Sequence, residues 1–585
     1  MDESLRLVVI VLVVMGAYAA LLALVVARYL QPTARRVLAV LTIFEIGLIV
    51  VHLLTRTTPG FWRWFLDPRA ELGVGAVFSA GQFLIIMILA LVFILPDRSG
   101  VHKGSLGQRL YWLVMGLLFG FLWLNEYFGF HDRSVVLFNL LPLLGLLAAG
   151  LTLIAALWLF PGQRAVLWIM LLGLAVTGFA GVVLDALANA HTFTWGGLTI
   201  DWFDRSLSIA GLGVQNYEVL EEFLEMAGAT LILSALVSYA VVTLPVVVWR
   251  RTRWALASGA VLWIVWSLAN LWIIPALERS LLAQDVAISY PAEVAQPVAY
   301  RVSTAVAAPG DTVEVTVYFQ NEQALDTDYY LSVHALTRPD GESVAHADLQ
   351  LGEWEYPSSA WISGLPVRNR AQLELPADLP PTSLWIAARL WLPREGASLK
   401  RLTEFDLIGV AVAETAQTLI TPDTVVLFDL PVVDRDTPLS EPPIAAEYSF
   451  DGGLTMTGYG LPNEAILGES LLLDFWWQTV NAPTLEADLV QFIHLFHADG
   501  ETYHVYDAEP LGGRFPTSHW PGDFATQDTL TVPLPEDLPP GEWEVHAGFY
   551  EPVNKERINV VDENGTPVQD FSITLGTVTL TAPEE

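Results

Sequence analysis

The sequence predicts a membrane α-helical bundle of about eight transmembrane helices, followed by two all-β sandwich domains. Composition is the first reason, because 53% of the 585 residues are hydrophobic and only 16% are charged. Charge distribution is the second reason. Residues 1–280 hold 17 Lys or Arg and 16 Asp or Glu, a net charge of +1. The total is −34, so the remaining residues carry a net charge of −35. We therefore predict a polytopic transmembrane domain over 1–280 and sandwiches over 286–430 and 440–582.

Eight apolar runs in the first domain approach or exceed the ~20 residues needed to cross ~30 Å of hydrocarbon. They are 7–30, 37–54, 73–95, 110–130, 135–159, 165–187, 219–248 and 254–275. The seventh run opens with acidic residues, so its first turns are expected at the membrane surface. The fourth and fifth runs are separated only by the polar stretch 131–134.

The loop cations predict the orientation of the spans. One set of loops carries ten Lys or Arg residues, from Arg28 to Arg253, against the single acid Asp97. Cytoplasmic loops are enriched in Lys and Arg, so this set is assigned to the cytoplasm. The N-terminus is then outside, and eight crossings leave the acidic second half outside as well. The expected location is the bacterial cytoplasmic membrane with extracytoplasmic C-terminal domains.

Beyond residue 285 the hydrophobic pattern changes to short alternating runs separated by Pro, Gly and Asp. Thr312–Gln320 and Ser470–Gln478 are examples, and this spacing is typical of antiparallel sandwich strands. The pattern also repeats. Leu-Pro-Ala-Asp-Leu-Pro-Pro at 375–381 recurs as Leu-Pro-Glu-Asp-Leu-Pro-Pro at 534–540, and Trp361 recurs as Trp520 with the same offset. The second sandwich is therefore predicted to be a repeat of the first.

The segment 534–552, with Arg557 and residues 561–565 after it, resembles a C-terminal immunoglobulin-like domain. Such domains occur in tandem on bacterial multi-pass membrane proteins, many of them uncharacterised and some with glycosyltransferase-like membrane domains. The resemblance implies an extracytoplasmic immunoglobulin-like fold for the second half. It does not imply an activity, because one fold hosts many functions.

Composition also excludes several kinds of site. The chain has no cysteine, which excludes disulfides, iron–sulfur clusters and thiolate zinc sites. The strongly acidic second half would repel phosphate, so no nucleic-acid partner is expected. Phosphate-binding loop, zinc-protease and nucleophile-elbow motifs are absent from the sequence.

The candidate site residues are ionisable groups within or beside the spans, since such groups are costly in hydrocarbon and are functional candidates by default. The catalytic candidates are Glu45, His52, Glu126, Asp185, Glu222 and Glu225. Four of them, Glu45, His52, Asp185 and Glu222, are also candidate ligands of a divalent cation such as Mg, Ca, Mn or Zn. The alternative interpretation is structural: the glutamates favour a helix N-terminus, are solvated, or pair with Arg133, Arg205 or Arg279.

Two functions follow from these observations. In the first, the protein is a cell-envelope scaffold whose sandwich pair binds a surface glycan or protein partner. In the second, it is a membrane-embedded enzyme or transporter with an outward-facing carboxylate/histidine site for a lipid-linked or ionic substrate. The lipid bilayer is the expected partner in both, and no cofactor is predicted beyond the candidate divalent cation.

Overall fold

The computed structural model divides the chain into two compact units. The helical unit comprises Met1–Glu278 with Asn321–Asp328 and Trp354–Val367, and the β unit comprises Arg279–Gln320, Tyr329–Glu353 and Arg368–Glu585. The structure describes residues 3–55, 60–68, 70, 73–95, 105–128, 135–184, 192–195, 198–201, 218–286, 288–291, 294–353, 356–393, 405–409, 412–413, 419–435, 437–481, 483, 485 and 487–583.

The first half of the helical unit consists of long apolar helices and one short one. The first, α1 (Glu3–Leu21), continues through a π turn at Leu22–Val26 into α2 (Ala27–Tyr29). The others are α3 (Pro32–Thr55), the short α4 (Phe61–Phe65), α5 (Val74–Val92) and α6 (Leu106–Phe128). Pro32 occupies the first position of α3, where its missing N–H costs nothing. The short helix α4 follows the second predicted span and consists of the aromatic-rich sequence Phe-Trp-Arg-Trp-Phe.

The second half of the helical unit adds four long helices and a hairpin. The helices α8 (Val135–Ile154) and α9 (Arg164–Gly178) are each extended by a π turn, at Ala155–Leu159 and Phe179–Leu184. The hairpin of β1 (Thr192–Trp195) and β2 (Leu198–Asp201) comes next, followed by α11 (Glu218–Thr243) and α12 (Val246–Leu268). A further π turn at Ala269–Ile273 connects α12 to α13 (Ile274–Leu282). α11 ends earlier than the predicted span 219–248. Pro245 cannot donate a helical hydrogen bond and disfavours helix at the residue before it.

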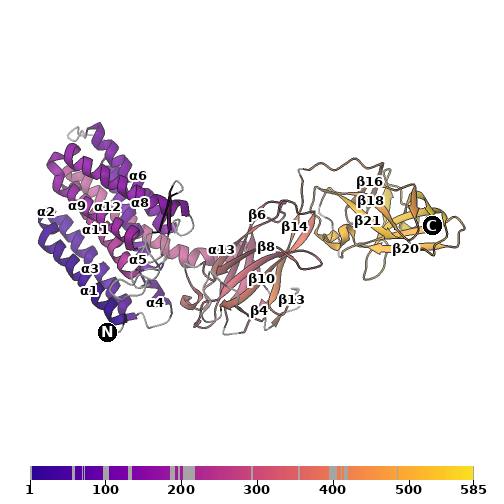
Figure 1. The fold of residues 1–585 in the computed structure, drawn as a ribbon, viewed down its shortest axis with the longest axis horizontal. Coiled ribbons are helices and arrows are strands. Elements are labelled where there is room, and N and C mark those ends of the chain that lie inside the picture. The colour runs from indigo at the N-terminus through magenta and orange to yellow at the C-terminus, as the bar shows by residue number, and fades with distance from the viewer. Residues whose placement is uncertain are drawn as a thin grey trace. The chain divides into compact units, whose positions relative to one another are not determined.

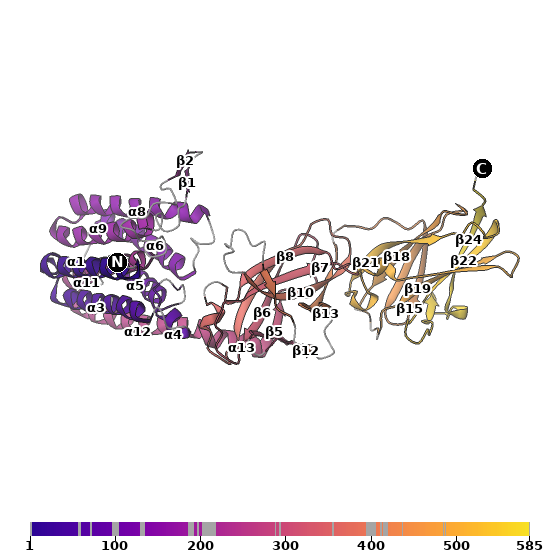
Figure 2. The same ribbon diagram turned by 60° about the horizontal axis from the view of Figure 1, so that its bottom comes forward.

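Among the described residues, seven helices are long and apolar enough to cross a membrane, and a shorter apolar helix covers Leu143–Leu159. The predicted helical membrane bundle is thus confirmed at this level. The helices lie side by side, with α11 packed against α3, α5 and α9 (Figures 1 and 2). In the best 18-residue window of α11, 78% of residues are buried, against at most 44% in any other candidate span. α11 is therefore the central helix of the bundle.

The β unit begins with two facing sheets. One has the order β13–β14–β10–β7–β8, with β11 on β10, and the other has the order β3–β5–β6–β9. The strands are β3 (Gln284–Asp285), β5 (Gln296–Val302), β6 (Thr312–Gln320), β7 (Tyr330–Leu336), β8 (Ser343–Gln350), β9 (Val367–Glu374), β10 (Thr382–Pro393), β11 (Phe405–Leu407), β13 (Leu419–Thr421) and β14 (Thr424–Val432). A separate pair joins β4 (Ile288–Ser289) to β12 (Val412–Ala413).

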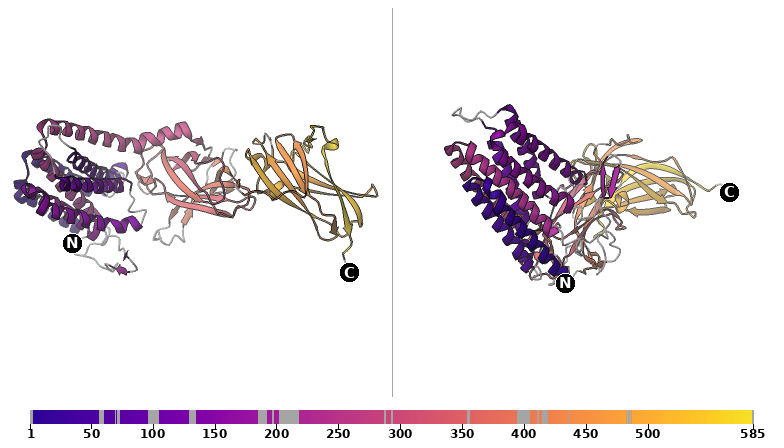
Figure 3. Two further views of the ribbon diagram at one scale, coloured as in Figure 1. Left: turned by 90° about the horizontal axis from the view of Figure 1, so that it is seen from above. Right: turned by 60° about the vertical axis from the view of Figure 1, so that its left-hand side comes forward.

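A second pair of sheets follows (Figure 3), with the orders β21–β18–β16–β15–β23 and β17–β24–β22–β19–β20. The strands are β15 (Ile444–Phe450), β16 (Leu454–Gly460), β17 (Glu464–Ile466), β18 (Ser470–Thr479), β19 (Val490–His497), β20 (Tyr503–Ala508), β21 (Phe524–Pro533), β22 (Gly541–Tyr550), β23 (Val560–Asp562) and β24 (Ile573–Thr581). The order β9–β6–β5 in the first sandwich corresponds to β21–β18–β16 in the second, and β14–β10–β7–β8 corresponds to β24–β22–β19–β20.

Both recurring tryptophans are buried, Trp520 in the core of the second sandwich and Trp361 in the segment Trp354–Val367 of the helical unit. Trp361 is 4% exposed and Trp520 is 1% exposed. Each indole N–H donates to the carbonyl oxygen of the residue five positions earlier, Tyr356 (2.7 Å) or Phe515 (3.0 Å). Burying a large indole with its one polar atom satisfied stabilises a fold, so these two residues are structural.

Candidate functional site

The carboxylate cluster

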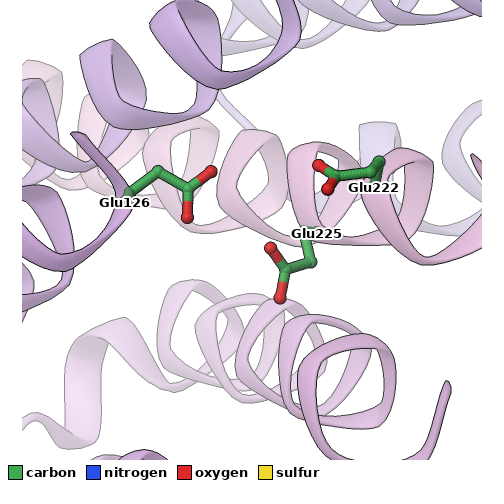
Figure 4. A group of neighbouring side chains, drawn as sticks. All are labelled: Glu126, Glu222 and Glu225. Atoms are coloured by element: carbon green, nitrogen blue, oxygen red, sulfur yellow. The ribbon is translucent and has the colours of Figure 1, made fainter. Parts of the chain in front are cut away.

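Three of the candidate residues meet at one end of the helical bundle. Glu126 lies near the end of α6, while Glu222 and Glu225 lie in the first two turns of α11. One carboxylate oxygen of each lies within 4.8 Å of one from each of the others, and all three side chains are half-buried. Figure 4 shows Glu126 and Glu222 pointing toward one another, with Glu225 between them. We call these three residues the carboxylate cluster.

Neighbouring residues hold the cluster in place. The buried hydroxyl of Ser79 on α5 donates to Oε1 of Glu126. Gly181, in the π turn after α9, leaves room for Glu225, because a Cβ at that position would lie 2.5 Å from Oε1 of Glu225. Asp67 and Glu221 also lie close enough to Glu222 to interact with it electrostatically. Four segments distant in sequence therefore build this site.

The charges of the cluster need compensation. Two unit negative charges 4.8 Å apart repel by roughly 3 kcal/mol at an effective dielectric constant of ~20. Three ionised carboxylates at this spacing would therefore strongly oppose one another, unless they share protons or a cation. A set of carboxylate oxygens beside a serine hydroxyl suits a hard divalent cation such as Mg²⁺, Ca²⁺ or Mn²⁺. Water molecules would complete the coordination.

The Glu45 network

Glu45 lies deeper in the bundle, in a different set of contacts. Its side chain is fully buried, and its Oε1 accepts hydrogen bonds from Thr230 on α11 (2.5 Å) and from Nε2 of Gln82 on α5 (3.3 Å). Nε2 of Gln82 also donates to the Thr230 hydroxyl (2.6 Å). We call these three residues the Glu45 network. Three helices thus contribute one polar group each to a point inside the bundle.

Several buried oxygens around Glu45 have no hydrogen-bond partner among the described residues. They are Oε2 of Glu45, Oε1 of Gln82 and Oγ1 of Thr42, which lies three residues before Glu45 on α3. Buried polar groups are normally paired, and an unpaired one costs ~1–3 kcal/mol. The network therefore has capacity for a further polar species, such as a proton, a water molecule or a cation.

Placement of the sequence candidates

The structure separates the residues that the sequence grouped together. Nδ1 of His52 lies 3.7 Å from Oδ1 of Asp67, and neither His52 nor Glu45 belongs to the carboxylate cluster. Asp185 lies outside the described residues, as do Arg133 and Arg205. Arg279, one expected partner of the glutamates, instead pairs with Asp285 at 2.8 Å. Without an imidazole, the donor set favours Mg²⁺, Ca²⁺ or Mn²⁺ over Zn²⁺.

Sequence reasoning missed five contributors to these sites: Asp67, Ser79, Gln82, Thr230 and Gly181. Gln82 and Thr230 carried a usable signal, since each is a polar residue at the middle of an apolar span. Ser79 and Gly181 carried none, because serine and glycine are common in membrane helices for packing reasons alone.

Comparison with known proteins gives no family for this chain. No protein-family model and no curated protein matches it. Among solved structures, 170 chains match part of it. One is the crystal structure of red sea bream transglutaminase, with 11% sequence identity and a TM-score of 0.13, covering 49% of this chain and 31% of the transglutaminase. So low a TM-score supports no statement about fold or activity.

Proposed function

We propose that this protein is a cation transporter of the bacterial cytoplasmic membrane, with the carboxylate cluster as its extracytoplasmic entry site. The observation that carries the proposal is the set of polar residues along the central helix α11. Glu222 and Glu225 stand at one end, Thr230 contacts Glu45, and the buried Ser234 and Ser238 follow at four-residue intervals. We call these five residues the α11 polar row.

The length of the row favours transport over catalysis at the surface. From Glu222 to Ser238 the helix rises ~24 Å at 1.5 Å per residue, a large part of the ~30 Å hydrocarbon thickness. The row ends where the Ser238 hydroxyl accepts a hydrogen bond from the backbone N–H of Gln31, at the start of α3. Intramembrane ionisable and polar residues mark ion pathways and proton relays. An enzyme acting at the outer surface would need only the glutamates at the outer end of the row.

The expected orientation agrees with the proposed direction. Loops rich in Lys and Arg predict that the start of α3, next to Gln31, faces the cytoplasm and that the carboxylate cluster faces outside. The acidic cluster would then attract cations from the extracytoplasmic side. Glu45, about halfway along α3, is the group that would exchange a proton or a cation inside the bundle.

Flux into liposomes tests this proposal. The full-length protein would be reconstituted with a Mn²⁺-sensitive or a pH-sensitive dye trapped inside, and dye response would be followed after Mn²⁺ or acid is added outside. We expect influx of at least one ion above the rate of protein-free liposomes. Glu222→Gln and Glu45→Gln should return the rate to background, because each removes a carboxylate from the route.

Two controls make the result decisive. Asp537→Asn removes an exposed carboxylate of the second sandwich and should leave flux unchanged. Thermal unfolding with and without Mn²⁺ reports binding separately, since a ligand stabilises the state that binds it. Binding of Mn²⁺ without flux would favour a metal-dependent enzyme over a transporter. The absence of both binding and flux would refute the cation site.

A second candidate function, glycan or protein binding by the β unit, is favoured by one surface of the second sandwich. Phe496 of β19 pairs with Tyr503 of β20, and they are 42% and 65% exposed. On the same face, His494 pairs with both Val505 and His546. Exposed clusters of apolar and aromatic side chains mark interaction sites, and aromatic rings also offer faces for sugar rings.

Sedimentation of the purified protein with insoluble cell-wall glycan tests this second function. The double variant Phe496→Ala/Tyr503→Ala should stay in the supernatant if the face binds glycan. Val553→Ala, at a side chain that is 86% exposed in a turn, serves as the control and should sediment like the original protein. Equal sedimentation of all three proteins would exclude this face.

A further inference from the structure

A cavity of about 360 Å³ lies among α3, α4, α5, α11 and α12, away from the carboxylate cluster and sharing only Gln82 with the Glu45 network. Its volume falls at the lower end of the ~300–1,000 Å³ typical of ligand pockets. Of its twenty lining residues, only Gln82, Ser267 and Trp263 carry a polar side-chain atom. Trp263 donates its indole N–H to the Val77 carbonyl (2.9 Å), and Ser267 donates to the Trp263 carbonyl (3.0 Å). The amide nitrogen of Gln82 donates to Glu45 and Thr230, so among these three residues only Oε1 of Gln82 is without a hydrogen-bond partner in the described part of the chain.

The cavity is long and narrow. Its wall runs from Val74 to Ile88 along α5 and from Leu256 along α12 to Leu271 in the π turn that follows it. At 1.5 Å per residue these stretches are ~21 Å and ~22 Å long. A volume of 360 Å³ spread over that length is a slot, which suits one extended chain better than a compact ring system.

The slot is continuous with the surface that faces lipid. Phe44 and Ile264 line it, and they are also 41% and 52% exposed on helices apolar enough to span a membrane. In a bilayer, hydrocarbon tails would therefore surround its opening. Water would gain little in the slot, because a stable buried water needs two to four polar partners and the wall offers the unpaired Oε1 of Gln82.

We propose that this slot binds one hydrocarbon chain of a membrane lipid. The chain would lie along α5 and α12, between Trp263 on one side and Leu233 of α11 on the other. Because lipid tails are as apolar as the wall, close packing rather than the hydrophobic effect would hold the chain in place. The proposal does not depend on the cation site, since no residue of the carboxylate cluster lines the slot.

Leu233 makes the proposal testable, because it lines the slot yet is only 4% exposed on the central helix. Bulk lipid cannot reach it without entering the slot. The full-length protein would be reconstituted in phosphatidylcholine vesicles containing some phosphatidylcholine with a diazirine within one acyl chain. After irradiation, mass spectrometry of peptides would locate the label. We expect labelling of the α11 segment around Leu233.

Two matched glycine variants supply the control. Gly259 lines the slot and a Cβ there meets no atom within 4 Å, so Gly259→Phe can place its ring in the cavity. Gly145, exposed on α8, also has open space around its Cβ position. Gly259→Phe should lower labelling at Leu233 about tenfold, equivalent to ~1.4 kcal/mol of binding, while Gly145→Phe should leave it unchanged.

The possible results distinguish the lipid-chain proposal from the transport proposal. Absence of label at Leu233 in the original protein, or undiminished label in Gly259→Phe, would overturn the proposal. Unfolding temperatures establish that each variant is folded, and Gly259→Leu replaces Gly259→Phe if the larger side chain prevents folding. Cation flux in Glu222→Gln is measured separately, so failure of the slot and failure of the transport proposal give different results.

Discussion

At the scale of single residues, the molecule places acidic groups in two environments. In the carboxylate cluster the glutamates face one another, so like charges oppose folding unless a cation or protons intervene. In the Glu45 network one buried carboxylate receives hydrogen bonds from neutral donors. The first arrangement favours binding of positive charge from outside the bundle, and the second favours exchange of a single charge within it.

Replacing one acid of the cluster should therefore have opposite effects on the stability of the metal-free and the metal-bound protein. Without divalent cations, Glu222→Gln should raise the unfolding temperature, because it removes repulsion of roughly 3 kcal/mol per ionised pair. With Mn²⁺ present, the variant should lose the stabilisation that the original protein gains. Thermal scans of detergent-purified protein measure both, and a variant less stable than the original without metal would contradict the electrostatic argument.

A histidine of the first sandwich gives a prediction about acid stability. Burial, with the nearby Arg389 and His346, lowers the pKa of His334 from 6.5 to about 4. The unfolded chain therefore takes up a proton at a pH where the folded chain does not. The stability contributed by His334 is complete above pH ~6.5 and is lost as the pH falls toward 4.

We expect the calorimetric unfolding temperature of the β unit to fall between pH 6.5 and pH 4, and His334→Gln to reduce that fall. His504→Gln is a matched control, because His504 lies at an edge strand of the second sandwich and contacts the Pro533 carbonyl. An identical pH dependence in His334→Gln and the original protein would rule out this residue as the source.

At the scale of elements, α11 organises the helical unit through close contact with α9. Gly173 of α9 and Gly228 of α11 face one another, and a Cβ on either would lie 2.7 Å from the carbonyl oxygen of the other. Small residues at such crossings let two helix backbones approach closely. This contact fixes the depth at which α11 presents Glu225 and Thr230 to their neighbours.

Gly228→Ala should consequently destabilise the bundle. Its Cβ would lie 2.2 Å from Oγ1 of Thr177, so the helices must separate, at a cost of about 1–3 kcal/mol. Gly150→Ala on α8 meets no atom within 4 Å and should be neutral or slightly stabilising. Unfolding temperatures in detergent compare the two variants, and equal temperatures would show that α9 and α11 tolerate separation.

The elements also mark what the sequence can and cannot predict. Runs of apolar residues located the helices, and alternation located the strands, because each pattern reflects local geometry. The partners of the site residues could not be derived. Glu45 and His52 lie two turns apart on α3, yet Glu45 bonds to Thr230, 185 positions away, and His52 lies beside Asp67. Helix packing decides such pairs, and one sequence does not encode it in any local pattern.

At the scale of the whole molecule, the two sandwiches of the β unit are joined by direct contacts as well as by a linker, the chain between β14 and β15. The backbone N–H of Ser383 donates to the Arg514 carbonyl (3.0 Å), and Nε of Arg514 donates to the Pro381 carbonyl (3.2 Å). The Ser383 hydroxyl also bonds to Nδ1 of His519 (2.9 Å). Val433, at the start of the linker, packs into the core of the second sandwich.

These contacts predict coupled unfolding of the sandwiches. The original protein should show a single calorimetric transition for the β unit, whereas Arg514→Ala/His519→Ala should separate it into two. Arg435→Ala is the control, because Arg435 is exposed and its guanidinium donates to the Gly522 carbonyl (3.2 Å), within the second sandwich. Two transitions already present in the original protein would show that the sandwiches unfold independently.

The central position of α11 has a consequence for how the protein is made. The helices that contact it most extensively, α3, α5 and α9, all precede it in the chain and so leave the ribosome first. When α11 is inserted, the hydrogen-bonding groups of Glu45 and Gln82 are already in the bilayer to receive Thr230. The order of synthesis thus spares the polar side chains of α11 a lipid-exposed intermediate, whereas a permuted chain that began with α11 would have to release it into the bilayer alone.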